Sequence, residues 1–312
     1  MEPQPRAVID VGTNSVKLLV ARVGGRSVEP LFEQSEQTRL GRGFYETQRL
    51  QPDAVAATAR AVAEFAAMAR QRRADPIRVI ATSAARDARN PAELVDAIRR
   101  SSGLTLDIIS GEQEADYVFQ GVASDPRLAA LSVLILDVGG GSTEFIVGEA
   151  GRATFRRSFP LGTVRLLETL PPNDPPRADD WEHCRAWLQD FLDRQISPAV
   201  APVLRARGQP LQVVGTGGTT TLLARMHHET NDFDRDLIEA TRFGREQIRA
   251  RREHLWSLPL AERKRIAGLP PNRADVILFG VAIYEAILEK FSFTELRVST
   301  RGLRFGAVLA PP

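Results

Sequence analysis

One motif occurs twice in this 312-residue chain and constrains its fold more than any other feature. Residues 9–20 read IDVGTNSVKLLV, and residues 136–147 read LDVGGGSTEFIV. Each copy is an apolar run with an Asp near its end, then Val-Gly, a small polar turn with Ser in the same place, and a second apolar run. Such a pattern predicts a strand–turn–strand unit. The repetition predicts two duplicated domains facing each other across a cleft, and the alternative is a chance similarity of two hairpins.

Strand and helix patterns alternate along both halves of the chain, which predicts an α/β fold. In the first half, we expect strands over residues 7–11, 16–23, 77–81 and 104–109, and helices over residues 54–73, 91–100 and 112–123. In the second half, we expect strands over residues 131–137, 145–147, 211–214 and 296–299, and helices over residues 181–195, 245–256 and 273–291. Pro126 is the expected boundary, giving domains 1–126 and 127–312 with a last helix that can pack back on the first domain.

Composition narrows the class of protein. The chain has 41 Lys+Arg against 39 Asp+Glu, a formal net charge of +2, and no basic tail that would indicate a nucleic-acid partner. No apolar run approaches the ~20 residues of a membrane span, and no secretory signal opens the chain. The single cysteine, Cys184, excludes an internal disulfide and fits a reducing compartment. We therefore expect a soluble cytoplasmic protein without a membrane partner.

Both polar turns are candidate phosphate-binding loops. Backbone N–H groups in a turn rich in small residues can converge on an anion, and hydroxyl groups add donors. An ordinary hairpin turn, in which Gly and Asn supply positive φ, is the alternative. The candidate phosphate-binding residues are Gly12, Thr13, Asn14 and Ser15 in the first turn and Gly140, Gly141, Ser142 and Thr143 in the second.

Acidic residues flank both turns and suggest a divalent cation. Asp10 and Asp137 lie near the ends of apolar strands, and Glu144 lies seven residues after Asp137. Mg²⁺ prefers one or two carboxylates together with water and substrate phosphates. The alternative is that Glu144 is a solvated strand residue and Asp137 caps a turn. We expect phosphate and metal together, since an acid beside a phosphate loop repels the anion unless a cation is present.

Two further segments carry candidate site residues. Gly111-Glu112-Gln113-Glu114 opens a helix, where a carboxylate is either favoured by the helix dipole or serves as a general base for water. Gly217, Gly218 and Thr219 lie between a strand and a helix, where N–H groups can meet a phosphate or a nucleotide. The candidate arginines near turns are Arg86, Arg165 and Arg273, each of which individually also fits a surface position.

Eight segments, in order along the chain, resemble the exopolyphosphatase/guanosine pentaphosphate phosphatase family. They read IDVGTNSVKLLV, ATSAARDARN, SGEQEA, LDVGGGSTEFIVG, FPLGTVRL, VVGTGGTTT, GLPPNRADVILFG and VSTRGLRFG. The resemblance runs from residue 8 to about residue 307. It implies the actin-like ATPase fold, in which two ribonuclease-H-like domains flank a cleft.

The resemblance also implies roles for matched positions. Glu114 matches the catalytic base, and Asp137 and Glu144 match the residues linked to the divalent metal. The two Gly-rich turns match the phosphate loops of the family. Arg86 matches an arginine that meets phosphate from the first domain, and Arg273 lies in a segment linked to substrate binding by the second.

The implied activity is metal-dependent hydrolysis of the terminal phosphoanhydride of inorganic polyphosphate, with Mg²⁺ or Mn²⁺ as cofactor and a homodimer as the assembly. Hydrolysis of guanosine pentaphosphate, with guanosine tetraphosphate as a related ligand, is the first alternative, and a non-hydrolytic actin-like nucleotide- or phosphate-binding module is the second. Position 113 is Gln where many members carry an acid, which favours Glu114 over Glu112 as the base. The chain resembles the short form of the family, in which processivity on long polyphosphate is in doubt.

Overall fold

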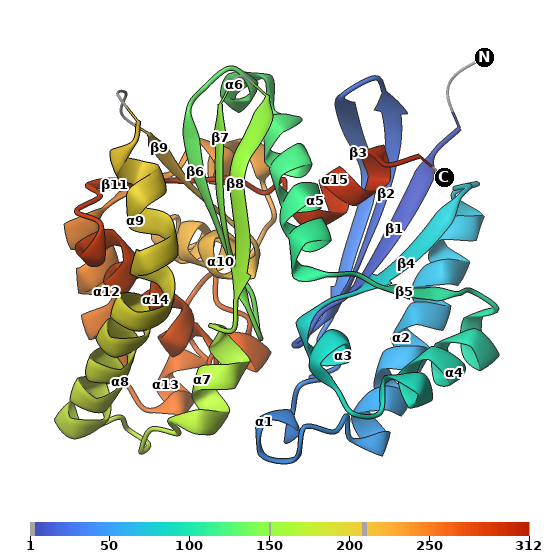
Figure 1. Ribbon diagram of the computed structural model, residues 1–312. Coiled ribbons are helices and arrows are strands. Elements are labelled where there is room, and N and C mark those ends of the chain that lie inside the picture. Colours follow the sequence, from blue (N-terminus) through green and yellow to red (C-terminus); the bar gives the residue numbers. More distant parts are fainter. Residues whose placement is uncertain (1–3, 150, 208–210, 312) are drawn as a thin grey trace. The chain divides into compact units, whose positions relative to one another are not determined.

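The computed structural model describes residues 4–149, 151–207 and 211–311 and divides into two compact units (Figure 1). The first unit contains the residues up to Ala129 together with those from Arg301 onward. The second unit is Ala130–Thr300. Each unit has its own sheet and its own apolar core. The second unit is therefore an insertion between two parts of the first.

The first unit is built on a five-stranded sheet of order β3-β2-β1-β4-β5. β2 lies antiparallel to both β1 and β3, whereas β4 is parallel to both β1 and β5. The strands are β1 (Arg6–Val11), β2 (Val16–Gly24), β3 (Ser27–Glu36), β4 (Ile77–Ala81) and β5 (Leu106–Ile108). The helices are α1 (Phe44–Thr47), α2 (Pro52–Gln71), α3 (Ser83–Asp87), α4 (Pro91–Ser102), α5 (Gly111–Ala123), α6 (Pro126–Ala129) and α15 (Leu303–Leu309).

Local sequence explains where the main helices of this unit begin and end. α2 and α4 start with proline at the first helical position, where the missing N–H costs nothing. α4 ends at Gly103, whose φ of 73° is in the left-handed region that favours glycine. α5 is capped by the Ser110 hydroxyl, which accepts a hydrogen bond of 3.1 Å from the Gln113 N–H. The helices predicted over residues 54–73, 91–100 and 112–123 are confirmed.

The second unit contains a six-stranded sheet of order β10-β11-β9-β6-β7-β8. The strands are β6 (Val133–Val138), β7 (Thr143–Glu149), β8 (Arg152–Phe159), β9 (Gln212–Thr216), β10 (Arg242–Gly244) and β11 (Glu295–Val298). The helices are α7 (Thr163–Thr169), α8 (Ala178–Phe191), the π-helical η1 (Leu192–Ile196), α9 (Ser197–Arg205), α10 (Gly218–His227), α11 (Arg235–Ala240), α12 (Arg245–Ser257), α13 (Leu260–Arg263), the 3-10 turn η2 (Pro271–Arg273) and α14 (Ile277–Lys290).

The two sheets follow the same plan. β7 is antiparallel to β6 and β8, and β9 is parallel to β6 and β11, which reproduces the arrangement of β1 to β5. β10 is an additional edge strand, antiparallel to β11. The predicted fold class, an α/β chain of two similar domains, is confirmed.

The structure corrects three details of the predicted elements. The helix expected over residues 273–291 begins only at Ile277, because residues 271–273 form a separate 3-10 turn. The helix expected over residues 181–195 begins at Ala178 and changes to π-helix after Phe191. β3 and β8 were not predicted, because each is an edge strand whose alternate residues are polar or charged.

Within the first unit, α15 crosses α5 with backbone against backbone. A Cβ added at Gly121 would lie 2.1 Å from the Gly302 carbonyl oxygen, and one at Gly306 would lie 1.8 Å from that of Tyr117. Arg304 then donates a hydrogen bond of 2.7 Å to the Leu18 carbonyl on β2. Residues after position 300 therefore complete the first unit.

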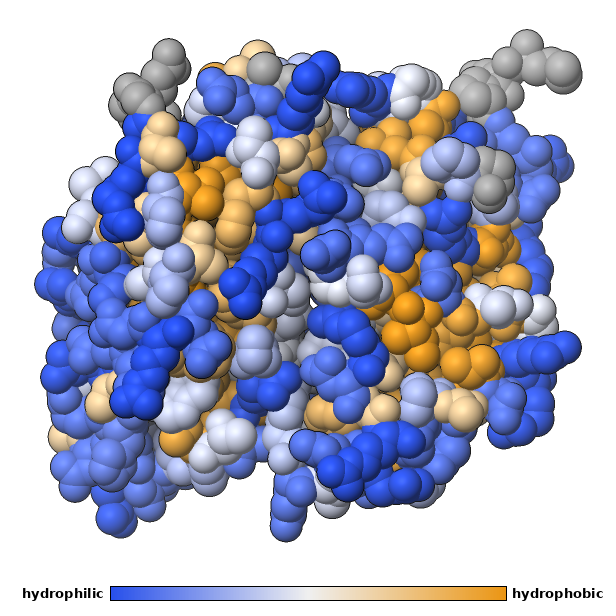
Figure 2. Space-filling view, viewed as in Figure 1, coloured by the Kyte–Doolittle hydropathy of each residue, from blue (hydrophilic) through white to orange (hydrophobic). Residues whose placement is uncertain are grey.

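The two apolar cores are buried, and hydrophilic side chains cover most of the face shown in Figure 2. Within the described ranges, no helix combines the length and the apolar character needed to cross a membrane.

Candidate functional site

Both repeated turns close with the same backbone hydrogen bond. The Gly12 N–H donates to the Ser15 carbonyl at 3.0 Å, and the Gly139 N–H donates to the Ser142 carbonyl at 2.9 Å. A Cβ at either glycine would lie only 3.2 or 3.1 Å from that serine oxygen, so both positions favour glycine for steric reasons. The sequence repeat is therefore a repeat of turn geometry.

Residues 39–41, which follow β3, form hydrogen bonds to the first turn, and we call this segment the first brace. The Gly41 N–H donates to the Thr13 carbonyl at 2.7 Å, and the Arg39 N–H donates to the Asn14 carbonyl at 3.0 Å. Leu40 between them is fully buried and anchors the segment in the core. A Cβ at Gly41 would lie 2.3 Å from the Cγ2 of Thr13, so the turn and its brace are in direct contact.

The second turn has an equivalent brace at the start of α7. The N–H groups of Thr163 and Val164 donate to the carbonyls of Gly139 and Gly140 at 3.0 and 2.9 Å, and Arg165 Nε donates to the Gly141 carbonyl at 3.0 Å. A Leu-Gly pair again precedes these contacts, with Leu161 fully buried. A Cβ at Gly162 would lie 2.4 Å from the Gly140 carbonyl oxygen.

These contacts make the turns suitable for an anion. The carbonyl oxygens of residues 13–15 and 139–142, which would repel phosphate, each accept a hydrogen bond from the brace or from the turn itself. Backbone N–H groups and small side chains are thus the groups that can meet a ligand. In the first turn, the buried Asn14 Nδ2 has no hydrogen-bond partner among the residues that the structure describes.

Candidate residues of the first unit follow three parallel strands at their carboxyl ends. The turn that follows Asp10 comes after β1, Arg86 lies on α3 after β4, and Glu114 lies on α5 after β5. Neighbouring parallel strands bring these ends to one edge of the sheet. There Arg86 Nη1 donates to Glu114 Oε2 at 2.8 Å and to the Ile109 carbonyl at 3.3 Å. Glu114 is buried, and the guanidinium fixes the orientation of its carboxylate.

Asp10 is buried at the end of β1 beside two cations. Burial raises the pKa of this carboxyl group, while the charges of Lys17 and Arg304 act in the opposite direction. Asp10 Oδ1 has no hydrogen-bond partner among the described residues. Lys17 is the residue directly opposite Asp10 on β2.

In the second unit, a row of oxygen-bearing side chains crosses four adjacent strands. The pairing register places Glu144 opposite Asp137, with one further residue paired on each outer side. We call this set the second row; its members are Ser158, Glu144, Asp137 and Thr216. Side chains of directly paired residues share one face of a sheet. The Ser158 hydroxyl donates to Glu144 Oε1 at 2.7 Å.

The second row fits a hard divalent cation. Two carboxylates on one face match the donor set that Mg²⁺ uses when substrate phosphates and water complete its shell. The Thr216 hydroxyl is buried and has no hydrogen-bond partner among the described residues. Gly217, with φ of 90°, leaves space for Asp137, because a Cβ there would lie 2.3 Å from Asp137 Oδ1. Within the same described residues, no group of three or more His, Cys, Asp or Glu side chains forms a metal centre.

The Gly217–Thr219 turn is held by α14. A Cβ at Gly280 would lie 2.6 Å from the Cγ2 of Thr219, and the Tyr284 hydroxyl lies 3.1 and 3.3 Å from the carbonyls of Leu136 and Thr216. Burial, together with the negative charges of Asp137 and Glu144, raises the pKa of Tyr284 well above its usual value. Tyr284 therefore stays a neutral donor beneath the second row.

In each unit, the predicted site residues other than Arg273 thus lie at or just after the ends of neighbouring strands. Sequence reasoning missed the two Leu-Gly braces, the outer residues of the second row and Arg304. An inspection of the repeats over a longer window would have found the braces, because Leu40-Gly41 and Leu161-Gly162 both follow the third strand of their unit. Arg273 lies at the end of η2, before α14, and its N–H donates to the Pro270 carbonyl.

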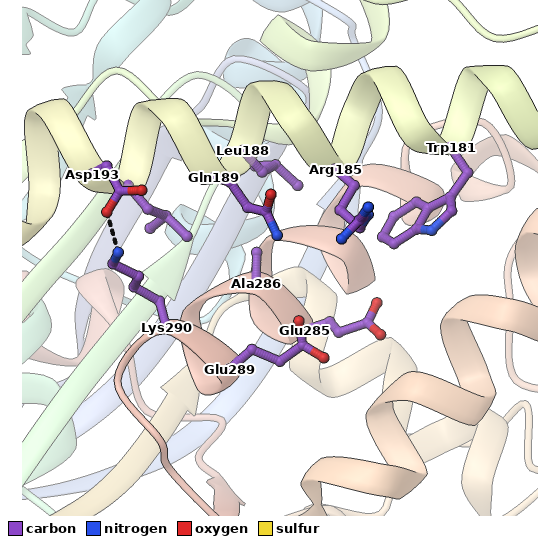
Figure 3. Close-up of a pocket in the computed structure, with 10 residues that line it drawn as sticks. Trp181, Arg185, Leu188, Gln189, Asp193, Glu285, Ala286, Glu289 and Lys290 are labelled. Atoms are coloured by element: carbon purple, nitrogen blue, oxygen red, sulfur yellow. Dashed lines mark hydrogen bonds and ion pairs between the residues drawn. The ribbon is translucent and has the colours of Figure 1, made fainter.

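A separate pocket of about 290 Å³ lies between α8–η1 and α14 (Figure 3). None of the sequence-predicted site residues lines it. Its buried acid, Glu285, pairs with Arg252 at 2.7 Å, and Lys290 pairs with Asp193. These ion pairs join α12 to α14 and α14 to η1, so the charged residues at this pocket hold the helices together.

A model of the Ppx/GppA phosphatase family matches residues 19–310. Exopolyphosphatase 2 of Mycobacterium tuberculosis is 30% identical to this chain over 321 residues, covering 97% of each protein. The crystal structure of an exopolyphosphatase from Cytophaga hutchinsonii superimposes with a TM-score of 0.84 at 26% identity, covering 97% of this chain and 96% of that one. A Ppx/GppA structure from Aquifex aeolicus gives 0.79 at 29% identity, covering 98% and 96%.

Proposed function

Because the chain belongs to the Ppx/GppA phosphatase family, we propose that it is an exopolyphosphatase that releases orthophosphate from the end of inorganic polyphosphate. The reaction is hydrolysis: water attacks the terminal phosphorus, the phosphoanhydride P–O bond breaks, and the shortened chain leaves with that oxygen. The relatives named exopolyphosphatase, and their coverage along nearly the whole chain, support this choice of substrate.

The pair of braced turns carries the proposal. A polyphosphate chain is a flexible anion with no sugar or base, so recognition must come from groups that bind phosphate oxygens. Both turns have their carbonyl oxygens occupied by hydrogen bonds, which leaves donors as the groups that can face a ligand. Residues 12–15 and 140–143, together with Gly217, Gly218 and Thr219, are the proposed phosphate-binding groups. We add Arg273 on the resemblance of its segment alone.

Asp137 and Glu144 would hold Mg²⁺, with Mn²⁺ as a substitute. When bound, this ion supplies positive charge that neutralises the phosphoryl oxygens as negative charge develops on them. The hydroxyl of Ser158 orients Glu144 through a hydrogen bond. The absence of a side chain at Gly217 leaves room for the Asp137 carboxylate.

Glu114 would accept the proton of the attacking water. Its carboxylate is buried, which protects it from bulk solvent, and its orientation is fixed by Arg86. Arg86 would also contact a phosphate oxygen, which couples the base to the presence of substrate. A general base of this kind typically contributes on the order of 10²–10⁴-fold to the rate.

The proposal includes two properties of the whole molecule. Cys184 is buried and unpaired, and burial raises the pKa of its thiol to about 12, which fits a reducing cytoplasm. A homodimer would let arginines of two copies contact a longer substrate.

The test is orthophosphate release by the purified protein with Mg²⁺ on short polyphosphate, long polyphosphate and guanosine pentaphosphate. We expect release from polyphosphate and a loss of turnover on the order of 10²–10⁴-fold in Glu114→Gln, with little change in substrate affinity. Glu112→Gln is the matched control, because Glu112 is exposed two residues earlier on the same helix. Release from the nucleotide alone would instead identify a guanosine pentaphosphate phosphohydrolase, and a folded Glu114→Gln variant with full activity would remove Glu114 from its role.

A further inference from the structure

The strand pairing of the first unit defines a counterpart of the second row. Asp10 lies opposite Lys17, with one further residue paired on each outer side. We call this set the first row; its members are Ser35, Lys17, Asp10 and Ile80. The four positions correspond strand by strand to those of the second row, since β3, β2, β1 and β4 correspond to β8, β7, β6 and β9.

Two of the four positions differ, and both differences remove an oxygen donor for a cation. Lys17 takes the place of Glu144, which changes the central strand pair from two carboxylates to one carboxylate and one ammonium group. Ile80 takes the place of Thr216, so an apolar side chain stands where the second row has a buried hydroxyl. Asp10 and Asp137 are both aspartates at corresponding positions, but the residues paired with them carry opposite charges, positive for Lys17 and negative for Glu144.

We infer that the first row is a metal-free copy of the second, in which Lys17 supplies internally the positive charge that a divalent cation supplies to Asp137 and Glu144. The protein therefore binds one divalent cation per chain, and Asp10 is not a metal ligand. The inference rests on the proposed metal-binding role of the second row, and it removes Asp10 from the metal ligands expected from the sequence.

The surroundings of Asp10 support this assignment. Arg304 reaches β2 from α15 and donates to the carbonyl of Leu18, the residue after Lys17. It also forms an ion pair of 3.0 Å with Glu33. Lys17 and Arg304 are the two cations whose charges act on the Asp10 carboxylate. A divalent ion at Asp10 would meet both of them, and like charges repel. The unpartnered Asp10 Oδ1 is thus compensated by nearby charge rather than by a bound ion.

The functional consequence is that the two copies of the motif meet phosphate with different sources of positive charge. In the first row the ammonium group of Lys17 balances the carboxylate of Asp10, so phosphate can approach this turn without a prior metal-binding step. The second row attracts phosphate only after it has bound its ion. The two motifs would thus bind phosphate in different ways, the first directly and the second through a cation.

The test counts Mn²⁺ ions bound per chain, by electron paramagnetic resonance titration of the protein without substrate. We expect one Mn²⁺ for the natural sequence, none for Glu144→Lys/Thr216→Ile, and two for Lys17→Glu/Ile80→Thr, which gives the first row the donors of the second. Lys17→Met is the matched control and should still bind one, because it removes the ammonium group without adding a carboxylate.

Single substitutions keep the test decisive if the Ile80→Thr change disturbs folding. Asp10→Asn should leave Mn²⁺ affinity unchanged, whereas Asp137→Asn should weaken it at least about tenfold. Two Mn²⁺ ions in the natural sequence, none in it, or a loss of Mn²⁺ binding in Asp10→Asn would each overturn the inference. Because no substrate is present, these counts are independent of whether polyphosphate is the molecule hydrolysed.

Discussion

The two repeated turns can be compared residue by residue, because they share a backbone and differ in side chains. Both close with a Gly-to-Ser hydrogen bond, and both are braced by a buried Leu followed by Gly. The first turn carries Thr13 and Asn14, whose side chains are buried, where the second carries Gly140 and Gly141. Duplication has thus preserved the peptide scaffold that orients N–H groups, while the charges and donors around it have diverged. Conserved geometry in this molecule does not mean conserved chemistry.

The largest expected difference between the two strand pairs concerns catalysis. Glu144→Gln should lower turnover on polyphosphate at least about 100-fold and raise the Mg²⁺ concentration needed for half-maximal rate, because a proposed metal ligand is lost. Lys17→Met should raise the KM for polyphosphate more than it lowers kcat, because only an attractive charge is removed. Initial rates over a grid of Mg²⁺ and substrate concentrations measure both effects. Equal changes in Mg²⁺ requirement for the two variants would break the comparison.

An intermediate difference concerns the stability of the two braces. Gly162→Ala should lower the free energy of unfolding by about 1–3 kcal/mol, because its Cβ would meet the Gly140 backbone, which cannot move aside. Gly41→Ala should cost less, since the closest atom to its Cβ, at 2.3 Å, is the side-chain Cγ2 of Thr13, and the Thr13 carbonyl oxygen is farther away at 3.2 Å. Urea unfolding followed by circular dichroism measures both.

The rescue variant sharpens this prediction. Thr13→Ser removes the obstructing methyl group, so the pair Gly41→Ala/Thr13→Ser should recover most of the stability lost in Gly41→Ala. If Gly162→Ala proved as mild as Gly41→Ala, the second brace would have to be less rigid than its hydrogen bonds to residues 139–141 indicate.

The smallest expected effect concerns pH. Burial raises the pKa of Asp10 in the folded state, so the folded protein retains a proton that the unfolded chain releases as pH rises through the window above the usual aspartate value. Stability therefore falls as pH rises through that window, and Asp10→Asn should avoid the loss. We expect Asp10→Asn to unfold at a higher temperature than the natural sequence at pH 7, with the difference disappearing near pH 3.

Thermal unfolding between pH 3 and pH 7 checks this sign. Asp107→Asn is the control, because Asp107 lies on β5 of the same sheet and is exposed. A stability difference for Asp10→Asn that is independent of pH would contradict the assigned cause.

The sequence revealed the fold class and the strand-turn-strand units because both depend on local patterns. Apolar runs, Gly-rich turns and proline-initiated helices are signals within about ten residues, and the structure confirms most of the elements derived from them. β3 and β8 escaped prediction because strands at or near a sheet edge carry many polar residues. A strand such as β3 forms because it pairs with β2, and its own sequence carries little signal for a strand.

The site was predictable only in part for the same physical reason. Asp10, Asp137 and Glu144 could be named from their positions beside a turn. The contact between Arg86 and Glu114 joins residues 28 positions apart, and no periodicity within either segment indicates it. The contrast between Lys17 and Glu144 was visible in the aligned repeats, but it acquired a meaning only when the strand register placed each opposite an aspartate.

The insertion of the second unit within the first has a consequence for synthesis on the ribosome. Residues 130–300 form a complete unit and can fold as soon as they emerge. The first unit must wait for α15, whose glycine crossing with α5 and whose Arg304 contact with β2 come from residues after position 300. The first unit is therefore completed last, although its first residues are translated before those of the second unit.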